Sequence, residues 1–323
     1  MGDDLILVAG EALVDLIPLT GSSYEAVLGG SPFNTAIGLG RLGVSTGYAG
    51  RVSTDSMGEA IVERLNASSV DLGFVVRAPQ PSPLSFVTRG TEATGARYAF
   101  YLGSTAYDGP SPFPDKWPGH VGHLHIGSFS ATEGSLGKAS LQAFAQAAGV
   151  ATTSYDPNIR PLVIAPPEQT VVAVEARVRL STVVKVSDED LLWLYPNREP
   201  HEVAATWATF GPRLVVLTRG GAGAIAFFDG DSVERLAPTI TVVDTVGAGD
   251  SFMAALLAAM FDDGAIGRRA IADTQAYRSN AVEGWVSFAI AAAAITCTRK
   301  GANPPTRDEM RAITPAGVAS MPA

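Results

Sequence analysis

Apolar and polar positions follow two alternating patterns along most of the chain. Short apolar runs typical of buried strands, such as Leu5–Ala9 and the VVKVS segment that ends at Ser187, precede segments whose apolar residues recur at helical spacing. Helices are predicted over Leu136–Ala148, Asp188–Leu194 and Asp250–Phe261. Alternating strands and helices imply a mostly parallel sheet with helices on both faces, so we expect an α/β fold.

The pattern changes between residues 84 and 102. The segments LSFVTRG and ARYAFYLG alternate, are rich in aromatic and β-branched residues, and are separated by a turn rich in Gly and Thr. They predict an antiparallel ribbon rather than a strand–helix crossover. The segments GAIAFF and SVERLA predict a second hairpin late in the chain. No linker divides the sequence, so residues 1–323 are expected to form one domain from which the ribbon projects.

Two helix starts carry capping residues. Ser31 followed by Pro32 predicts a helix with Ser31 as its N-cap and the proline in its first turn. Asp55 is expected to open a second helix, whose apolar face includes Ile61 and Leu65.

The composition is that of an ordered protein with a sizeable core, since 46% of the 323 residues are hydrophobic and 17% are charged. A formal net charge of −9 argues against a general binder of nucleic acid or of anionic membranes. A single cysteine, Cys297, favours a reducing compartment, so a cytoplasmic protein is expected. Asp3 and Asp4 stand where a signal peptide is basic, and the longest apolar run, of about ten residues, is too short to span a membrane.

The segment Asp244–Phe252, DTVGAGDSF, is the most informative in the chain. Gly247 and Gly249 permit a tight turn and a close approach to a ligand at the start of an apolar helix. Backbone amides at a helix N-terminus favour anions, so this turn forms a cradle for charge on a phosphoryl group. Asp250 would reach a hydroxyl held beside that phosphate; the alternative is that Asp250 only caps the helix.

A second glycine-rich turn, GGSPFNTA, also opens a helix. Gly29 and Gly30 would let backbone amides contact a polyol, and Asn34 offers both a donor and an acceptor. The sequence has no GxxxxGK[ST] motif and no GxGxxG after its first strand, where Gly10 is followed by Glu11. A nucleotide phosphate must therefore be held in another way, and an NAD-dependent oxidoreductase is disfavoured.

These two segments resemble the two signatures of the ribokinase/PfkB family of carbohydrate kinases, in the family's order and across essentially the whole chain. GEALVDLIP, GGSPFNTA and DPNIRP look most like fructokinases. The resemblance implies a ribokinase-like three-layer sandwich with a mostly parallel central sheet. It also implies a small β-sheet lid formed by about residues 12–33 and 84–108. The expected activity is ATP-dependent phosphorylation of a sugar hydroxyl, with D-fructose as the expected acceptor.

The resemblance also assigns roles to the residues that match the family's motifs. Asp250 would be the general base, and the anion hole would be formed by Gly247, Ala248 and Gly249. Arg160 would bind the transferring phosphate or the sugar, which suits its planar fork of donors. The acceptor site would be completed by Asp15, Gly29, Gly30, Asn34, Phe100 and Asn158. A buried turn cap is the alternative for Asp15.

For the nucleotide, the resemblance implies a loop with Thr218, Gly220 and Gly223, a nearby Lys185, and an adenine wall with Ala294 and Gly301. Tight helix packing would explain the small residues of that wall equally well.

The cations follow from the same resemblance. This chain has Ser187 and Asp190 where the family has Asn and Glu, and Asp190 would hold Mg²⁺ through water. An acidic first helical turn is the alternative for Asp190. A monovalent cation such as K⁺ is a further expected cofactor.

Several alternatives stay open at this stage. The acceptor could be 2-keto-3-deoxygluconate, ribose, another ketose or a nucleoside, because lid and loop contacts decide it. A non-catalytic sugar-binding regulatory protein is the alternative of another class, although such a protein has no need of Asp250. His120, His123 and His125 are not expected to bind zinc, since no carboxylate lies near them in sequence. The outer face of the lid is expected to serve a homodimer.

Overall fold

The computed structural model describes residues 4–88, 97–113, 116–272 and 276–312. Asp3 and the Gly- and Thr-rich turn predicted inside the ribbon lie outside these residues. The largest element is a nine-stranded sheet in the order β15-β14-β13-β12-β11-β10-β1-β4-β6. Its strands are β1 (Leu5–Ala9), β4 (Thr46–Ala49), β6 (Val70–Asp71), β10 (Val121–Gly127), β11 (Thr152–Asp156), β12 (Val183–Ser187), β13 (Leu214–Thr218), β14 (Ala224–Phe228) and β15 (Asp231–Arg235).

Seven neighbouring strands of this sheet, from β13 to β6, are parallel, and only the β14–β15 hairpin at one edge runs antiparallel. The strand β1 lies near the middle and is buried throughout. Because side chains alternate across a strand, Ile6 and Val8 enter one core while Leu5, Leu7 and Ala9 enter the other. A strand buried on both faces is therefore apolar at every position.

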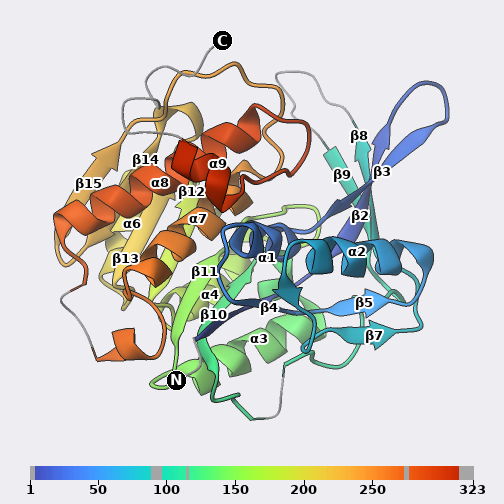
Figure 1. Cartoon of the computed structure of the whole chain (residues 1–323), viewed down its shortest axis with the longest axis horizontal. Coiled ribbons are helices and arrows are strands. Elements are labelled where there is room, and N and C mark those ends of the chain that lie inside the picture. Colours follow the sequence, from blue (N-terminus) through green and yellow to red (C-terminus); the bar gives the residue numbers. More distant parts are fainter. Residues whose placement is uncertain (1–3, 89–96, 114–115, 273–275, 313–323) are drawn as a thin grey trace.

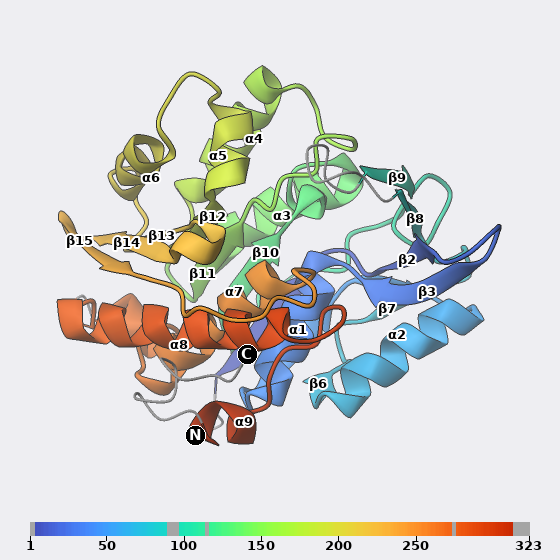
Figure 2. The same cartoon turned by 90° about the horizontal axis from the view of Figure 1, so that it is seen from above.

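Helices cover both faces of the large sheet. Figure 2 shows α1, α7, α8 and α9 on one side and α3, α4, α5 and α6 on the other, which makes three layers. The helices are α1 (Ser31–Arg41), α2 (Ser56–Ala67), α3 (Gly134–Ala147), α4 (Pro167–Val178), α5 (Asp188–Leu194), α6 (Pro200–Ala208), α7 (Ala248–Asp262), α8 (Ser279–Cys297) and α9 (Arg307–Ala312).

A small sheet with the order β3-β2-β8-β9 projects beside α1 and α2 (Figure 1). Its strands are β2 (Leu13–Pro18), β3 (Tyr24–Gly29), β8 (Leu84–Thr88) and β9 (Arg97–Tyr101). The strands β8 and β9 pair antiparallel, as the ribbon prediction required, and β2 pairs parallel with β8. A separate pair, β5 (Arg51–Ser53) and β7 (Val76–Ala78), lies near α2 (Figure 1).

The small sheet presents a row of residues on one face. Asp15 of β2 is in register with Ser85 of β8, and Ser85 is in register with Phe100 of β9. The next row, through Phe86 and Ala99, points to the opposite face because side chains alternate along a strand. The face that carries Asp15 is the one that bears on the candidate site described below.

The predicted α/β class is confirmed, and so are the predicted helix Asp188–Leu194 and the late hairpin. Asp55 caps α2 as predicted, because its carboxylate accepts the N–H of Gly58 at 2.8 Å. The prediction for Ser31 is wrong. The N-cap of α1 is Gly30, and Ser31 is the first residue of the helix, with its hydroxyl directed elsewhere.

The helix α8 is long and apolar enough to cross a membrane by length and composition alone. It packs instead against α7, β14 and β15, and 56% of its apolar window is buried. The apolar composition of α8 is therefore that of a core helix, which is buried between α7 and the large sheet.

Candidate active site

The turn before α7 has the geometry that its glycines predict. Gly247 caps the helix in the left-handed region at φ 77°, and a Cβ there would lie 2.6 Å from the Cβ of Ala302. The N–H of Ala248 donates to the carbonyl of Thr245 at 3.2 Å. Within the described residues the N–H groups of Gly249 and Asp250 have no partner, as expected for a first helical turn. These two amides are therefore available to an anion.

Asp250 joins the two glycine-rich segments. Its Oδ1 accepts a hydrogen bond from the Ser31 hydroxyl at 2.6 Å, and its Oδ2 accepts one from Asn34 Nδ2 at 2.8 Å. Asp250 is only 8% exposed. The hydroxyl of Ser31 thus holds the carboxylate rather than capping its own helix, and Asn34 does the same from the next turn of α1.

Asp15 stands on the inner face of the small sheet. The Ser85 hydroxyl donates to its Oδ1, and a Cβ at Gly29 would lie 2.4 Å from its Oδ2, so glycine leaves room for the carboxylate. Burial raises the pKa of Asp15, opposed by the hydrogen bond from Ser85 and by the charge of Arg160. Arg160 therefore acts on this carboxylate through its charge.

The segment after β11 directs Arg160. Its Nη1 donates to Asn158 Oδ1 at 2.7 Å and to the carbonyl of Ile159 at 3.0 Å. Asn158 adopts φ 39°, a left-handed conformation that asparagine tolerates better than most residues. Asn158 therefore orients the guanidinium, a contact that the sequence did not indicate.

Lys185 of β12 lies beneath the glycine-rich turn that precedes α7. Its Nζ pairs with Asp156 Oδ2 at 2.9 Å, and a Cβ at Gly249 would lie 3.0 Å from that Nζ. Burial lowers the pKa of Lys185, but the charges of Asp156, Asp190 and Asp250 outweigh it and raise the pKa above its ordinary value. Lys185 therefore stays charged and adds a buried positive charge to the site.

Asp190 is the third residue of α5 and forms a capping box with Ser187. Its Oδ1 also accepts the N–H of Ile159 at 2.8 Å, so one carboxylate links α5 to the Arg160 segment. Among the described residues no group of three or more His, Cys, Asp or Glu side chains is arranged to hold a metal ion.

The residues expected to bind nucleotide fall into two groups. Thr218 ends β13, and Gly220 follows it at φ 50°. Gly223 adopts φ 90°, and a Cβ there would lie 2.0 Å from the carbonyl of Arg235, so the adjoining hairpin itself requires glycine. In the second group, Gly301 donates its N–H to Asp244 Oδ2 at 2.8 Å, and Ala294 is buried in α8.

Two other predicted features have clear contacts. The ring of Phe100 lies 5.6 Å from that of Phe129, edge to face. His123 and His125 are buried and hydrogen-bonded to the hydroxyls of Thr152 and Ser154. Burial lowers the pKa of both histidines, so they are neutral members of the core.

Sequence reasoning missed Glu11, which follows the first strand after Gly10. Glu11 is 3% exposed, and burial raises its pKa to about 7, opposed by hydrogen bonds with Ser130 and Ser128 and by the charge of Arg160. The only signal in the sequence was an acidic residue two positions beyond the end of a buried strand, at the edge where α/β sheets bind ligands.

Comparison with known proteins defines the class. The family described as pfkB family carbohydrate kinase matches residues 3–309, and the chain belongs to this family. The protein is accordingly an ATP-dependent sugar kinase with a ribokinase-like fold.

Individual relatives narrow the resemblance. The chain is 36% identical over 283 residues to a fructokinase of Rhizobium leguminosarum bv. trifolii, covering 85% of this chain and 86% of the relative. It is similar to the crystal structure of a fructokinase from Vibrio cholerae O395 with fructose, ADP and calcium ion bound. The TM-score is 0.82 at 26% identity, over 96% of this chain and 98% of that one. A double mutant of the same enzyme, with fructose, ADP and potassium ion bound, gives a TM-score of 0.83 at 26% identity, over 97% and 99% of the two chains.

Gly247→Ala should destabilise the protein more than Gly264→Ala, its match at the other end of α7. Both positions are left-handed, at φ 77° and 69°, which costs an L-residue about 1–2 kcal/mol. Only Gly247 adds a close contact, with Ala302, worth about 1–3 kcal/mol of overpacking. Urea unfolding measures the difference; equal losses would mean that the turn can move away from Ala302.

Proposed function

We propose that the protein is a fructokinase that transfers the γ-phosphoryl group of ATP to D-fructose. The observation that carries the proposal is Asp250, fixed by Ser31 and Asn34 at the first turn of α7 beside the free amides of Gly249 and Asp250. A carboxylate next to an anion-binding turn is the arrangement that phosphoryl transfer to a hydroxyl requires. The named fructokinases to which the chain is similar support fructose as the acceptor.

In the proposed reaction, Asp250 accepts the proton of the sugar hydroxyl as its oxygen attacks the γ-phosphorus in line. The new O–P bond forms as the bond to the ADP oxygen breaks. The anion hole, assigned to Gly247, Ala248 and Gly249, stabilises the charge that develops on the phosphoryl oxygens. The N–H of Gly249, which has no partner among the described residues, is free for this role, whereas the N–H of Ala248 would be shared with the carbonyl of Thr245. Lys185 lies directly beneath Gly249 and adds its positive charge from a site with little water.

The acceptor is assigned to the space between the inner face of the small sheet and Asp250. Asp15 would accept hydroxyl hydrogen bonds, and the turn of Gly29 and Gly30 would bring backbone groups close to the sugar. Arg160, oriented by Asn158, would bind the sugar or the transferring phosphate. Phe100, in register with Ser85 and hence on the same face as Asp15, would close over the ring and exclude water.

The nucleotide is assigned to the side of α7 that faces Gly301. Val243 and Val246 expose 62% and 41% of their surface just before the anion-binding turn, and the N–H of Val243 is bonded to the carbonyl of Cys297 at the end of α8. An exposed apolar strip beside an anion site suits adenine, which needs a flat apolar contact. Thr218, Gly220, Gly223 and Ala294 complete the proposed nucleotide site.

The carboxylates here fit an ion that keeps most of its own waters. Asp156 Oδ1 is buried without a hydrogen-bond partner among the described residues, and Asp190 lies near enough to influence it electrostatically. Mg²⁺ typically keeps several waters and binds substrate phosphates, so Asp190 would hold it through water. The ion would neutralise phosphate charge. A monovalent cation such as K⁺ is proposed from the potassium-bound relative.

Three further assignments belong to this proposal. The protein would act in the cytoplasm, where a single cysteine stays reduced. Residues 1–323 would form one domain, with the small sheet as its lid.

The outer face of that sheet exposes Tyr24 and Tyr101, which pack on Phe86, and would pair with a second copy of the chain. Sedimentation at several protein concentrations tests the pairing.

The decisive experiment presents ATP with a panel of sugars and follows ADP release. D-Fructose should give the highest kcat/KM, ahead of ribose, 2-keto-3-deoxygluconate and nucleosides. Preference for another acceptor would reassign the substrate while leaving the sugar kinase class intact.

Asp250→Asn should keep the fold and sugar binding but lower kcat by about 10²–10⁴-fold, the contribution of a general base. The matched control is Asp262→Asn at the far end of α7, where the carboxylate pairs with Arg307 at the surface. Steady-state kinetics should show the loss only in the first variant. A kcat above about a tenth of the wild-type value would remove the base assignment.

Asp15→Ala should raise the sugar KM by about 10–100-fold and spare the ATP KM, because the lost hydrogen bonds involve a charged group. Asp71→Ala, an exposed carboxylate at the edge of the large sheet, is the control. An unchanged sugar KM would leave Asp15 with a purely structural role against Gly29 and Ser85.

Phe100→Ala should weaken sugar use and increase ATP hydrolysis without phosphorylation, because the lid would no longer exclude water. Tyr101→Ala, on the other face of the same strand, separates this effect from simple loosening of β9.

Amide hydrogen exchange gives a second test of the same assignment. Sugar should slow exchange in residues 84–102 more than in Ala289–Cys297, and a non-hydrolysable ATP analogue should do the reverse. Equal protection of both segments by both ligands would contradict the assignment.

A further inference from the structure

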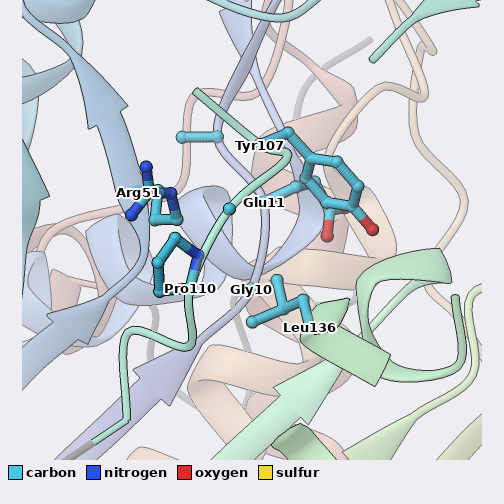
Figure 3. A pocket seen from close by; sticks show the side chains of 8 residues that line it. Gly10, Glu11, Arg51, Tyr107, Pro110 and Leu136 are labelled. Atoms are coloured by element: carbon cyan, nitrogen blue, oxygen red, sulfur yellow. The ribbon is translucent and has the colours of Figure 1, made fainter. Parts of the chain in front are cut away.

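A small cavity lies beside Glu11, where β1 ends (Figure 3). It measures about 10 Å³ for the centre of a water molecule, which is room for one water. Its walls come from the end of β1, the start of β5, the loop after β9 and the start of α3. The lining residues are Gly10, Glu11, Ala12, Arg51, Tyr107, Gly109, Pro110 and Leu136.

Two buried polar atoms at this cavity lack partners. Glu11 Oε2 and the hydroxyl of Tyr107 form no hydrogen bond within the described part of the chain. In Figure 3 the two side chains extend to the same end of the pocket, and the charge of Glu11 influences the Tyr107 hydroxyl. Buried polar groups in folded proteins are almost always paired, directly or through water, so these two atoms and the cavity call for one explanation.

The groups around Glu11 leave it little compensation for a negative charge. Tyr48 of β4 uses its hydroxyl on the carbonyl of Gly10, and Arg51 directs its Nε to the carbonyl of Ala106. Arg160 acts on Glu11 only through its charge, Ser128 and Ser130 oppose the rise of its pKa, and the Ser130 hydroxyl donates to the carbonyl of Gly127 at 3.1 Å. Glu133 and Asp108 act on Tyr107 and add negative charge on its side. With a pKa raised to about 7 by burial, Glu11 is a neutral acid in the lower half of the physiological pH range.

The backbone of Glu11 also contacts the turn of Gly29 and Gly30, which is assigned to the acceptor site. Its carbonyl oxygen would lie 2.4 Å from a Cβ at Gly30, so the glycine turn rests on it. The ring of Tyr107 lies 5.6 Å from that of Phe129, which in turn contacts Phe100 of the small sheet. Ser128, just before Phe129, is held at φ 61°, a conformation that persists only when its surroundings enforce it.

We propose that Glu11 is a positioning residue for the sugar acceptor. As a neutral acid it is bridged by one water in this cavity to the Tyr107 hydroxyl, and so fixes the Ser128–Ser130 turn and the Phe129 ring against Phe100. The proposal rests on the acceptor site assigned above. Ionisation of Glu11 places an uncompensated charge in the cavity and loosens the turn, so sugar affinity falls as the pH rises through about 7.

The test measures the sugar KM and the ATP KM between about pH 6 and pH 8. For a single titration near 7, the wild-type sugar KM should rise about tenfold over this range while the ATP KM stays level. Glu11→Gln keeps a neutral polar side chain and should remove the rise. Glu11→Ala and Tyr107→Phe should raise the sugar KM already at about pH 6, where the bridge is intact in the wild type, and should flatten the pH dependence. Tyr155→Phe, which deletes another buried, unpartnered tyrosine hydroxyl, is the matched control and should follow the wild type.

A second readout needs no turnover. Because the folded protein keeps the Glu11 proton up to about pH 7 and the unfolded chain loses it near its ordinary pKa of 4.5, wild-type Tm should fall relative to Glu11→Gln across that interval. At about pH 6, the Tm losses of Glu11→Ala and Tyr107→Phe should be non-additive in the double variant.

The outcomes separate this proposal from the proposed function. A wild-type pH rise that survives Glu11→Gln, a Tm difference independent of pH, or strictly additive Tm losses would each overturn the role of Glu11. Failure of every sugar tested to be phosphorylated would overturn the acceptor assignment, and the Tm measurements would still report on Glu11.

Discussion

The carboxylate of Asp250 ties the N-terminus of α1 to the N-terminus of α7, and the site depends on this contact. Ser31 and Asn34 reach it from the first two turns of α1, while Asp250 belongs to the first turn of α7. Both helix ends carry partial positive charge, so one carboxylate between them is favourable for both. Further along, Gly38 lets the helices approach, since a Cβ there would lie 2.6 Å from that of Ala254. Helix packing thus fixes this carboxylate, the proposed general base, before any substrate arrives.

A net charge of −9 is compatible with the proposed anion site, because the charges that act on that site are buried and local. Lys185 is 4% exposed beneath Gly249, where its charge is weakly screened. Asp156 keeps it compensated without occupying the turn itself. Substitution of Lys185 or Asp156 alone would leave the other charge buried and unpaired. Such a single substitution is expected to lower the stability of the folded protein by more than the intact pair contributes to it. The net charge of the whole chain therefore affects binding to non-specific partners, and it does not decide the charge at the proposed anion site.

Patterns within about ten residues predicted the fold well, because strand and helix periodicity are local properties. The helix Asp188–Leu194 and the β8–β9 ribbon followed directly from them. Ser31 was misread because a capping rule sees only neighbours, whereas its partner Asp250 is 219 residues away. The row from Asp15 through Ser85 to Phe100 depends on a parallel pairing of β2 with β8, which no local pattern encodes. The role proposed for Glu11 follows only from its burial in the folded protein, which no local pattern shows.

The residues proposed for phosphoryl transfer and those proposed for acceptor binding come from different sheets. Asp250, Lys185 and the anion-binding turn belong to the large sheet and its helices, while Asp15 and Phe100 belong to the small sheet. The chain enters the small sheet at Ala12 and leaves the β2–β3 hairpin at Gly30, and these crossings touch, since a Cβ at Gly30 would lie 3.1 Å from Ala12 Cα. If the proposed roles hold, substitutions in the small sheet can change the surface offered to an acceptor without moving Asp250. A fold arranged in this way can keep one proposed phosphoryl-transfer centre while its acceptor changes.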